Sequence, residues 1–487
     1  MDWNFLIRNK DSICVTTDSR KITPGCVFVA LKGEHFDGNL FVDQAIKDGA
    51  AYVIKGEHAL AELQDLARAW RRYLGLPILA ITGTNGKTTT KELTAQVLKT
   101  KYNLHYTQGN FNNALGVPLT LLQLTRAHEM AIVEMGASHP GDIKELVDIA
   151  EPDYGLITNV GKAHLQGFGS FEGVMRTKAE LYDYLLAKLA KQNSPDMSTP
   201  FPLGEGRGEA AKPAKPAKPA KPAKPAKPVK PAIFLNASNP HLQKMLSDSL
   251  CATCLPSDLI GTSLELHRNF IGTSLKCYTT ISMPTGTHLV GEYNAENIAA
   301  ALCVGEYFGV SREQGLEAVR AYVPTNNRSQ AMHTDRNELV IDAYNANPTS
   351  MAAAIEAFFS SPAGTFSSET FSSSKGTFSS ETFSSEAFSS PAGTFRRPSG
   401  ACILGAMREL GEYTHVEHQN IVNMLLERKV EQVLLVGQEF ADTTAPYPVF
   451  EDVTALRAYL TEHPIEGKRI LIKGSHSTQL ETIIDLL

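Results

Sequence analysis

The chain has 487 residues, of which 43% are hydrophobic and 20% charged, proportions typical of globular proteins and a length that favours about three domains. No apolar run approaches the roughly 20 residues that a membrane-spanning helix needs, and the opening MDWNFLIRNKDS lacks the layout of a signal peptide. The net charge of −6 and the missing basic footprint argue against nucleic-acid binding. We therefore expect a cytoplasmic protein without membrane insertion.

Residues 1–76 read as a small α/β domain. GCVFVALKG predicts a strand, and FVDQAIKDGAAYVI predicts a helix followed by a strand. From 77 to 323, the apolar runs PILAIT, MAIVEMG and YGLITNV alternate with the helical stretches KTTTKELTAQVLKT and AENIAAALCVGEYFG. Strands that alternate with helices predict a parallel sheet covered on both faces.

A third α/β unit is predicted over residues 324–487. ELVIDAY, ACILGAM, QVLLVG and RILIKGS read as buried strands with helical stretches between them, which indicates a Rossmann-like, doubly wound domain. The predicted fold class is therefore α/β with three domains. They are a small N-terminal domain, a central parallel-sheet domain of the P-loop type and this C-terminal domain.

Two repetitive segments are predicted to lie outside these cores. The first, at about 195–232, contains six Ala-Lys-Pro repeats and seven lysines without an acidic residue among them from 211 to 232. Proline at every third position favours extended polyproline II. The second, at about 360–399, repeats Phe-Ser-Ser units. We expect both to be solvated insertions, with partner binding by the Lys-Pro segment as the alternative to a spacer.

The seven cysteines are scattered and odd in number. This usage argues against a disulfide framework and fits a reducing compartment. Cys251 and Cys254 form one C-x-x-C pair, but no second pair of ligands lies at zinc-like spacing. We expect two incidental thiols there rather than a metal site.

The main chemical motif is LAITGTNGKTTTKE, residues 79–92, which predicts a strand, a tight turn and a helix. Ile81 stands where the usual phosphate-binding loop has its first glycine, so the strict pattern fails. Gly83 and Gly86 still allow backbone N–H groups to close around phosphate oxygens at a helix N-terminus. Lys87 can reach the β- and γ-phosphates, and Thr88 can ligate Mg²⁺.

Two further polar residues follow predicted strands. Glu134 ends MAIVE, and His164 follows YGLITNV. Open α/β sheets bind ligands at the carboxyl ends of their strands, and a carboxylate there is a natural Mg²⁺ ligand. A helix cap or salt bridge is the structural alternative for Glu134, and a structural role is equally compatible with a single histidine.

A series of motifs, in chain order, resembles the Mur ligases, the ATP-dependent amide ligases of peptidoglycan precursor synthesis. They are TDSRKITPGCVFVALKGEHFDGNLFVDQAIKDGA, GTNGKTTTKE, GNFNNALGVPLTLL, EMGASHPGDI, TNVGKAHLQGFGS, TKAELY, GEYNAENIAAAL and DAYNANPTSM. The resemblance covers nearly the whole chain apart from the two insertions. DAYNANPTSM and KGSHSTQLE, together with the absence of D-N-P-R, imply a member that adds D-alanyl-D-alanine to a UDP-N-acetylmuramoyl-tripeptide.

The resemblance also implies roles for individual residues. It implies catalytic roles for Lys87, His164 and Lys178. Lys178 matches a lysine that is carbamylated in the family. The resemblance implies two Mg²⁺ ions, with ligands at Thr88, Glu134, His164 and Lys178. ATP contacts fall on Gly83, Thr84, Asn85, Gly86, Lys87, Thr88, Thr89, Asn294, Asn297, Arg328 and Asp342.

Substrate contacts are implied at Thr17, Asp18, Ser19 and Arg20 for the uridine nucleotide and at Asn110, Asn112 and Asn113 for the muramoyl end. The sequence departs from the family at three positions: Tyr293 and Asn39 replace a usual histidine, and Asn327 replaces a common glycine. The expected enzyme is a monomer that forms an acyl phosphate from ATP and then an amide bond.

Three alternatives stay open. A sister ligase that adds diaminopimelate or lysine, or a folylpolyglutamate synthase-like enzyme, would share the phosphate loop. A non-catalytic nucleotide-binding module could use the repeat segments as tethers. A ligase could also act as a scaffold through its Lys-Pro segment.

Overall fold

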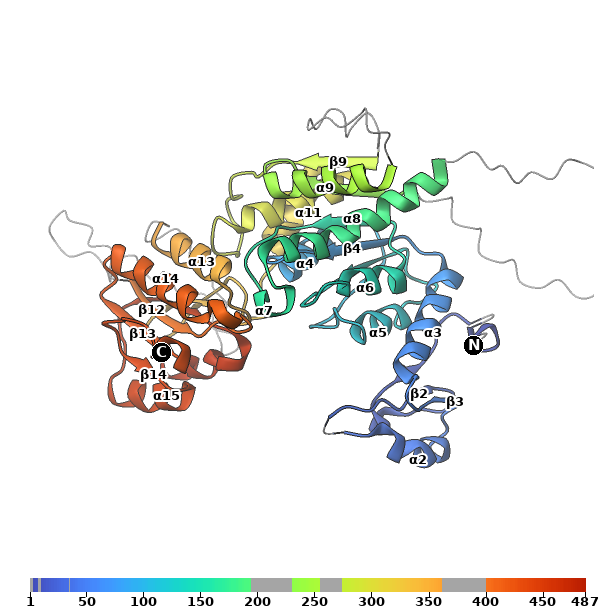
Figure 1. Cartoon of the computed structure of the whole chain (residues 1–487), viewed down its shortest axis with the longest axis horizontal. Helices are drawn as coiled ribbons and strands as arrows, with labels where there is room; N and C mark the ends of the chain where they lie inside the picture. Colours follow the sequence, from blue (N-terminus) through green and yellow to red (C-terminus); the bar gives the residue numbers. More distant parts are fainter. Residues whose placement is uncertain (1–2, 8–9, 35, 194–229, 255–273, 361–399) are drawn as a thin grey trace, which may run out of the picture.

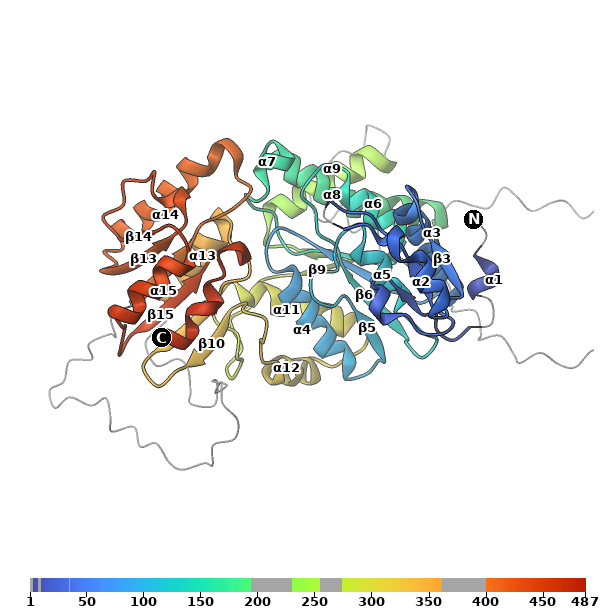
Figure 2. The same cartoon turned by 90° about the horizontal axis from the view of Figure 1, so that it is seen from below.

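The computed structural model describes residues 3–7, 10–34, 36–193, 230–254, 274–360 and 400–487. Three sheets follow one another along the chain, and the central one lies between the other two (Figures 1 and 2). This is the three-domain α/β fold that the sequence predicted, while the boundaries at 76/77 and 323/324 stay a prediction. The two expected insertions lie almost wholly outside the described residues.

The N-terminal sheet has three parallel strands in the order β1-β2-β3. They are β1 (Val15–Thr16), β2 (Val27–Val29) and β3 (Tyr52–Ile54). The helix α2 (Val42–Lys47) precedes β3, as predicted, and α1 (Asn4–Ile7) lies before the sheet in the chain. Short 3-10 turns span Ser19–Lys21 and Gly38–Phe41.

A disulfide in this domain corrects the expectation drawn from the cysteines. Val15 pairs with Val27 in the parallel register, so the residues one position earlier in each strand are neighbours. These are Cys14 and Cys26, which the structure joins with Cα atoms 4.6 Å apart. Cys251 is an exposed free cysteine on α9 (Pro240–Cys254). Among the described residues, no group of three or more His, Cys, Asp or Glu side chains could hold a metal ion.

The central sheet has six parallel strands in the order β5-β6-β4-β7-β8-β9. Their bounds are β4 Ile78–Thr82, β5 Leu104–Tyr106, β6 Met130–Glu134, β7 Tyr154–Ile157, β8 Ala232–Asn236 and β9 Leu275–Tyr278. Alternate residues of a strand point to opposite faces of the sheet, and the buried strand β4 supplies apolar side chains to both faces. Ile78 and Ala80 join one core cluster, and Leu79 and Ile81 join the other.

Helices cover both faces of this sheet. On the first face pack α3 (Ala59–Leu74), α5 (Gly116–Leu122), α6 (Asp142–Ala150), α8 (Phe171–Asn193) and α9. On the second pack α4 (Lys87–Lys99), α11 (Asn294–Tyr307) and α12 (Arg312–Ala321). The short α7 (Leu165–Phe168) follows β7. No helix in the described part of the chain is both long and apolar enough to cross a membrane.

A buried ionic cluster fastens α3 to the central sheet. Asp153, just before β7, pairs with Arg71 of α3 at 2.9 Å and Lys188 of α8 at 2.8 Å. Its Oδ2 also accepts the backbone N–H of Ile78 at 3.0 Å. Arg71 donates further to the carbonyl oxygens of Ala150 and Glu151. Because these groups are hydrogen-bonded to one another, their charges can be buried.

The C-terminal sheet has the strand order β10-β11-β15-β12-β13-β14. Its strands are β10 Gln330–His333, β11 Glu338–Asp342, β12 Gly400–Gly405, β13 Gln432–Val436, β14 Val449–Phe450 and β15 Arg469–Lys473. All pairs are parallel except β10 with β11. Helices α13 (Pro348–Ser360) and α14 (Thr414–Glu427) pack on one face, and α15 (Val453–Glu462) packs on the other. The sheet is doubly wound, as predicted.

Candidate active site

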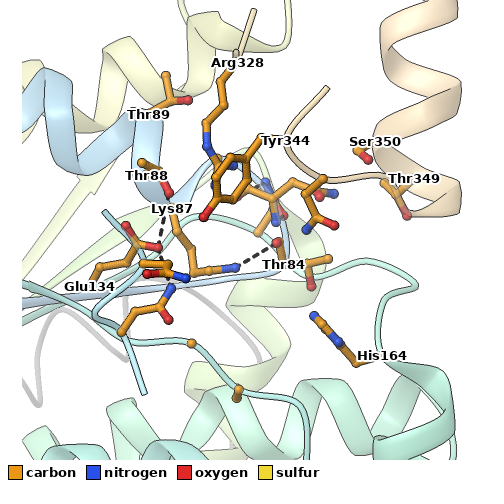
Figure 3. A pocket seen from close by; sticks show the side chains of 18 of the residues that line it. Thr84, Lys87, Thr88, Thr89, Glu134, His164, Arg328, Tyr344, Thr349 and Ser350 are labelled. Carbon is orange, nitrogen blue, oxygen red and sulfur yellow. Dashed lines mark hydrogen bonds between the residues drawn. The ribbon is translucent and has the colours of Figure 1, made fainter. Parts of the chain in front are cut away.

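A cavity of about 740 Å³ lies between the central and C-terminal domains. Its central-domain wall comes from the loops that follow β4, β6 and β7, the carboxyl ends at which α/β sheets bind ligands. Figure 3 shows Lys87, Glu134 and His164 on this side and Tyr344 and Thr349 on the C-terminal side around one space.

The loop between β4 and α4 forms one end of the cavity. Gly83 has φ 142° and Gly86 has φ 76°, backbone conformations that favour glycine. A Cβ atom at Gly86 would lie 2.3 Å from Oδ1 of Asn297, and one at Gly83 would lie 1.9 Å from Oγ1 of Thr158. Both glycines are therefore needed for the loop to close against its neighbours.

Lys87 opens α4 and turns its ammonium group back over the loop. Its Nζ donates to the carbonyl oxygens of Gly83 at 2.8 Å and Thr84 at 3.0 Å. Burial lowers the pKa of Lys87 to about 8. A cation held against loop amides at a helix N-terminus is suited to an oligophosphate.

Thr88 and Glu134 form a pair that fits Mg²⁺. Oγ1 of Thr88 donates to Oε1 of Glu134 at 3.2 Å, and Nδ2 of Asn112 donates to the same oxygen at 2.9 Å. Adjacent oxygen ligands of an octahedral Mg²⁺, each at about 2.1 Å, lie about 3 Å apart. Oε2 of Glu134 is buried without a hydrogen-bond partner in the described residues, although the ammonium of Lys91 lies 3.7 Å away.

His164 and Lys178 are the other two residues to which the sequence assigned a metal, and His164 lines the cavity. Burial lowers the pKa of His164, although the neighbouring carboxylate of Glu409 opposes this shift. Lys178 is buried, and burial also lowers its pKa. Within the described segments, its ammonium has no hydrogen bond or ion pair, and the ring of Phe168 lies 5.9 Å away.

Four residues outside the loop that the sequence assigned to ATP also line the cavity: Asn294, Asn297, Arg328 and Asp342. Asn297 donates to Oδ1 of Asn294 at 2.9 Å and accepts from Thr90 at 3.0 Å, so this pair is fixed by the helices. The guanidinium of Arg328 stacks on the ring of Tyr344, 3.9 Å from its centroid. This wall belongs to α11 and the C-terminal domain together.

The structure shows the local surroundings of the three departures from the family pattern. Asn327, where glycine is common, has φ 55°, and asparagine tolerates this left-handed conformation better than most residues. Tyr293, where histidine is usual, places its hydroxyl 2.9 Å from Oγ of Ser329. Asn39 accepts the N–H of Gly56 at 3.1 Å, which ties its turn to the end of β3.

The asparagines assigned to the muramoyl end also line the cavity. Asn112 contacts Glu134, as described above, and Oδ1 of Asn113 accepts the N–H of Gly116 at 2.8 Å at the start of α5. Asn110 contributes to the lining without a side-chain hydrogen bond among the described contacts.

The proposed uridine-binding residues Thr17, Asp18, Ser19 and Arg20 do not line this cavity. They lie after β1 in the N-terminal domain, where Asp18 and Arg20 form a two-point ion pair at 2.9 and 3.0 Å. Hydrogen bonds from Arg20 lower the pKa of Asp18 to about 2. Their assignment to the uridine nucleotide stays a prediction.

Sequence reasoning missed several residues that line the cavity or contact its lining. Lys473 forms an ion pair with Asp342 at 2.7 Å, and its position in KGSHSTQLE was an available signal. Asn347 of DAYNANPTSM donates to Oδ1 of Asn85 at 2.8 Å. Glu409 hydrogen-bonds Nδ1 of His164, and no motif indicated it.

Comparisons with known proteins agree with this geometry. Residues 13–95 match the model "Mur ligase family, catalytic domain", and residues 81–196 match "Mur ligase middle domain". UDP-N-acetylmuramoyl-tripeptide–D-alanyl-D-alanine ligase of Bacillus subtilis is 30% identical over 96% of this chain and 92% of its own. The ligase of the same name from Escherichia coli is 30% identical over 97% and 93%.

Solved structures show the same fold. MurF from Acinetobacter baumannii superposes with a TM-score of 0.69 at 23% identity, covering 97% of this chain and 92% of its own. The MurF ligase of Thermotoga maritima in complex with ADP superposes with a TM-score of 0.68 at 21% identity, covering 98% and 97%.

Proposed function

Because the chain belongs to the Mur ligase family, we propose that it is the ATP-dependent ligase that joins D-alanyl-D-alanine to UDP-N-acetylmuramoyl-tripeptide. The observation that carries this proposal is the 30% identity, over 96% of the chain, to a relative named for that reaction. The product would be the UDP-muramoyl-pentapeptide of peptidoglycan synthesis. The sister ligases and the non-catalytic module have no comparable support.

The reaction needs a carboxylate to become a good acyl donor. The terminal carboxylate of the tripeptide attacks the γ-phosphate of ATP, which forms an acyl phosphate and releases ADP. The amine of D-alanyl-D-alanine then attacks the acyl carbon, a C–N bond forms, the C–O bond to phosphate breaks, and inorganic phosphate leaves. Both reactants of the first step are anions, so positive charge must bring them together.

Lys87 and the loop amides bind the phosphates in this account. The Lys87 ammonium, now 2.8 Å from the carbonyl oxygen of Gly83, is placed to move onto the β- and γ-phosphates. Thr88 and Glu134 would hold one Mg²⁺, and His164 with a modified Lys178 would hold a second. When bound, Mg²⁺ neutralises charge between the two reacting anions and orients their oxygens.

Carbamylation of Lys178 is part of the proposal. A buried amine with a lowered pKa is present partly as the neutral nucleophile, which can add to CO₂ with loss of one proton. The product is an anionic carbamate, whose oxygens can ligate a hard cation. Carbon-13 bicarbonate should give a carbamate resonance that is absent in Lys178→Arg.

Domain closure completes the site. Arg328 and Asp342 of the C-terminal domain line the same cavity as Lys87, so ATP bound on the central domain would be covered from the other side. Covering the site excludes the water that would hydrolyse an acyl phosphate. We further propose that the N-terminal loop with Asp18 and Arg20 binds the uridine nucleotide, and that the enzyme is a cytoplasmic monomer.

The test is phosphate release from Mg-ATP with UDP-muramoyl tripeptide present throughout and D-alanyl-D-alanine added or omitted. Release should depend on the dipeptide and should vanish in Lys87→Ala. Release with diaminopimelate or lysine on the shorter precursor instead, or none with any amine, would overturn the assignment.

A further inference from the structure

His164 and Glu409 face each other across the boundary between the central and C-terminal domains. Nδ1 of His164 hydrogen-bonds Oε2 of Glu409, 245 residues away in the chain, and both residues line the cavity. Both have left-handed backbones, with φ 50° for His164 and φ 61° for Glu409. Such conformations cost free energy in residues other than glycine and recur at functional sites.

This hydrogen bond determines which ring nitrogen is free. A carboxylate only accepts hydrogen bonds, so Nδ1 of His164 carries the proton and donates. Nε2 therefore presents its lone pair. In the part of the chain that the structure describes, Nε2 has no hydrogen-bond partner. Histidines that ligate metals commonly donate their other ring N–H to a carboxylate, which fixes the tautomer and increases ligand basicity.

We propose that Glu409 is a positioning residue for the metal site of His164. It fixes the tautomer and orientation of the ring so that Nε2 faces a divalent cation. Because Glu409 belongs to the C-terminal domain, this site is complete only when that domain is docked on the central one. The inference rests on the proposed function, which places a divalent cation beside His164.

Docking and metal binding are then linked. Since docking adds Glu409 to His164, it tightens the metal site, and by thermodynamic reciprocity a bound cation favours the docked arrangement. The pair Thr88 and Glu134 belongs to the central domain and does not include Glu409. The two metal positions should therefore respond differently to a change at Glu409.

The same interface supplies a matched control. Lys162, two residues before His164, pairs with Glu417 of α14 at 2.7 Å. Glu417 is thus a second C-terminal carboxylate that holds the same segment but does not touch His164. Glu409→Gln and Glu417→Gln each remove one negative charge from the interface. Because the side chain of Glu409 is 57% exposed, we expect the first variant to fold, and thermal unfolding of both variants checks this.

The experiment is a Mn²⁺ titration of the full chain, read by electron paramagnetic resonance, with a non-hydrolysable ATP analogue and bicarbonate. Glu409→Gln should lower the affinity for the Mn²⁺ ion that is not bound with the nucleotide by about tenfold or more. Glu417→Gln should change this Mn²⁺ affinity by less than about threefold. The affinity for the ATP analogue without metal should be the same in both variants. In a His164→Ala background, Glu409→Gln should have no further effect.

Equal shifts in both carboxylate variants would show that Glu409 is only an interface anchor. An unchanged Mn²⁺ affinity in Glu409→Gln, or an effect that persists without His164, would also overturn the inference. Ligation of D-alanyl-D-alanine by the unmodified protein is measured in parallel. If that ligation occurs while the Mn²⁺ prediction fails, the inference is wrong and the proposed function stands.

Discussion

Removal of the Asn347 side chain should uncouple the C-terminal domain from the phosphate loop. Asn347 is 4% exposed, and its Nδ2 donates to Oδ1 of Asn85 at 2.8 Å. Its own Oδ1 accepts the N–H of Ser350 at 2.9 Å in the first turn of α13. One side chain therefore caps the N-terminus of α13 and hydrogen-bonds the loop that we assign to the ATP phosphates.

The expected loss follows from these two contacts. Leaving the partly buried amide oxygen of Asn85 without its partner costs about 1–2 kcal/mol, which corresponds to about a five- to thirtyfold fall in kcat/KM for ATP. Loss of the helix cap costs about 1 kcal/mol more, but this cost falls on α13 and is shared by any variant that lacks the cap. A double-mutant cycle with Asn85→Ala separates the two contributions.

The assay is kcat/KM for ATP in Asn85→Ala, Asn347→Ala and the double variant, with the other substrates saturating. The two losses should be strongly non-additive, with a coupling of about 1 kcal/mol. Losses that add to within about 0.3 kcal/mol, as for independent sites, would refute the view that this hydrogen bond connects the domains during the reaction.

Three other predictions follow from the same geometry. Gly86→Ala should weaken ATP binding at least about tenfold with the fold retained, because its Cβ would lie 2.3 Å from Asn297; a nucleotide titration that shows unchanged affinity would contradict this. Asp153→Ala should lower the free energy of unfolding by about 3–5 kcal/mol, since it leaves the buried Arg71 without its partner at 2.9 Å. Urea unfolding measures this loss, and a loss below about 1 kcal/mol would contradict the prediction. Burial lowers the pKa of Lys87 to about 8, so raising the pH through 8 removes a positive charge and should weaken ATP binding, a dependence that calorimetry should find absent in Lys87→Met.

The sequence predicted the features that depend on local pattern. The phosphate loop follows a five-residue apolar strand, and its two glycines adopt positive φ values, as residue spacing indicated. The apolar strands are buried on both faces, as continuous hydrophobic runs require. Such features are encoded within about 15 consecutive residues, so they are readable without tertiary information.

Contacts between distant segments were not predictable in this way. Asn85 and Asn347 are 262 positions apart, and either asparagine alone is compatible with a cap, a turn or a surface site. The Cys14–Cys26 pair depends on the register of β1 against β2. The number of cysteines in the chain gives no information on that register. Apart from the family resemblance, the residues around Lys178 do not distinguish it from an exposed helix lysine. It is buried because the packing of α8, and not its sequence neighbours, decides its environment.

The most direct test of the account follows one oxygen atom through the reaction. UDP-muramoyl tripeptide labelled with oxygen-18 in its terminal carboxylate is incubated with Mg-ATP, D-alanyl-D-alanine and the protein, and the products are analysed by mass spectrometry. The account predicts UDP-muramoyl pentapeptide together with one labelled oxygen in each phosphate released. Absence of the pentapeptide, or its formation with unlabelled phosphate, would contradict a ligase that works through an acyl phosphate.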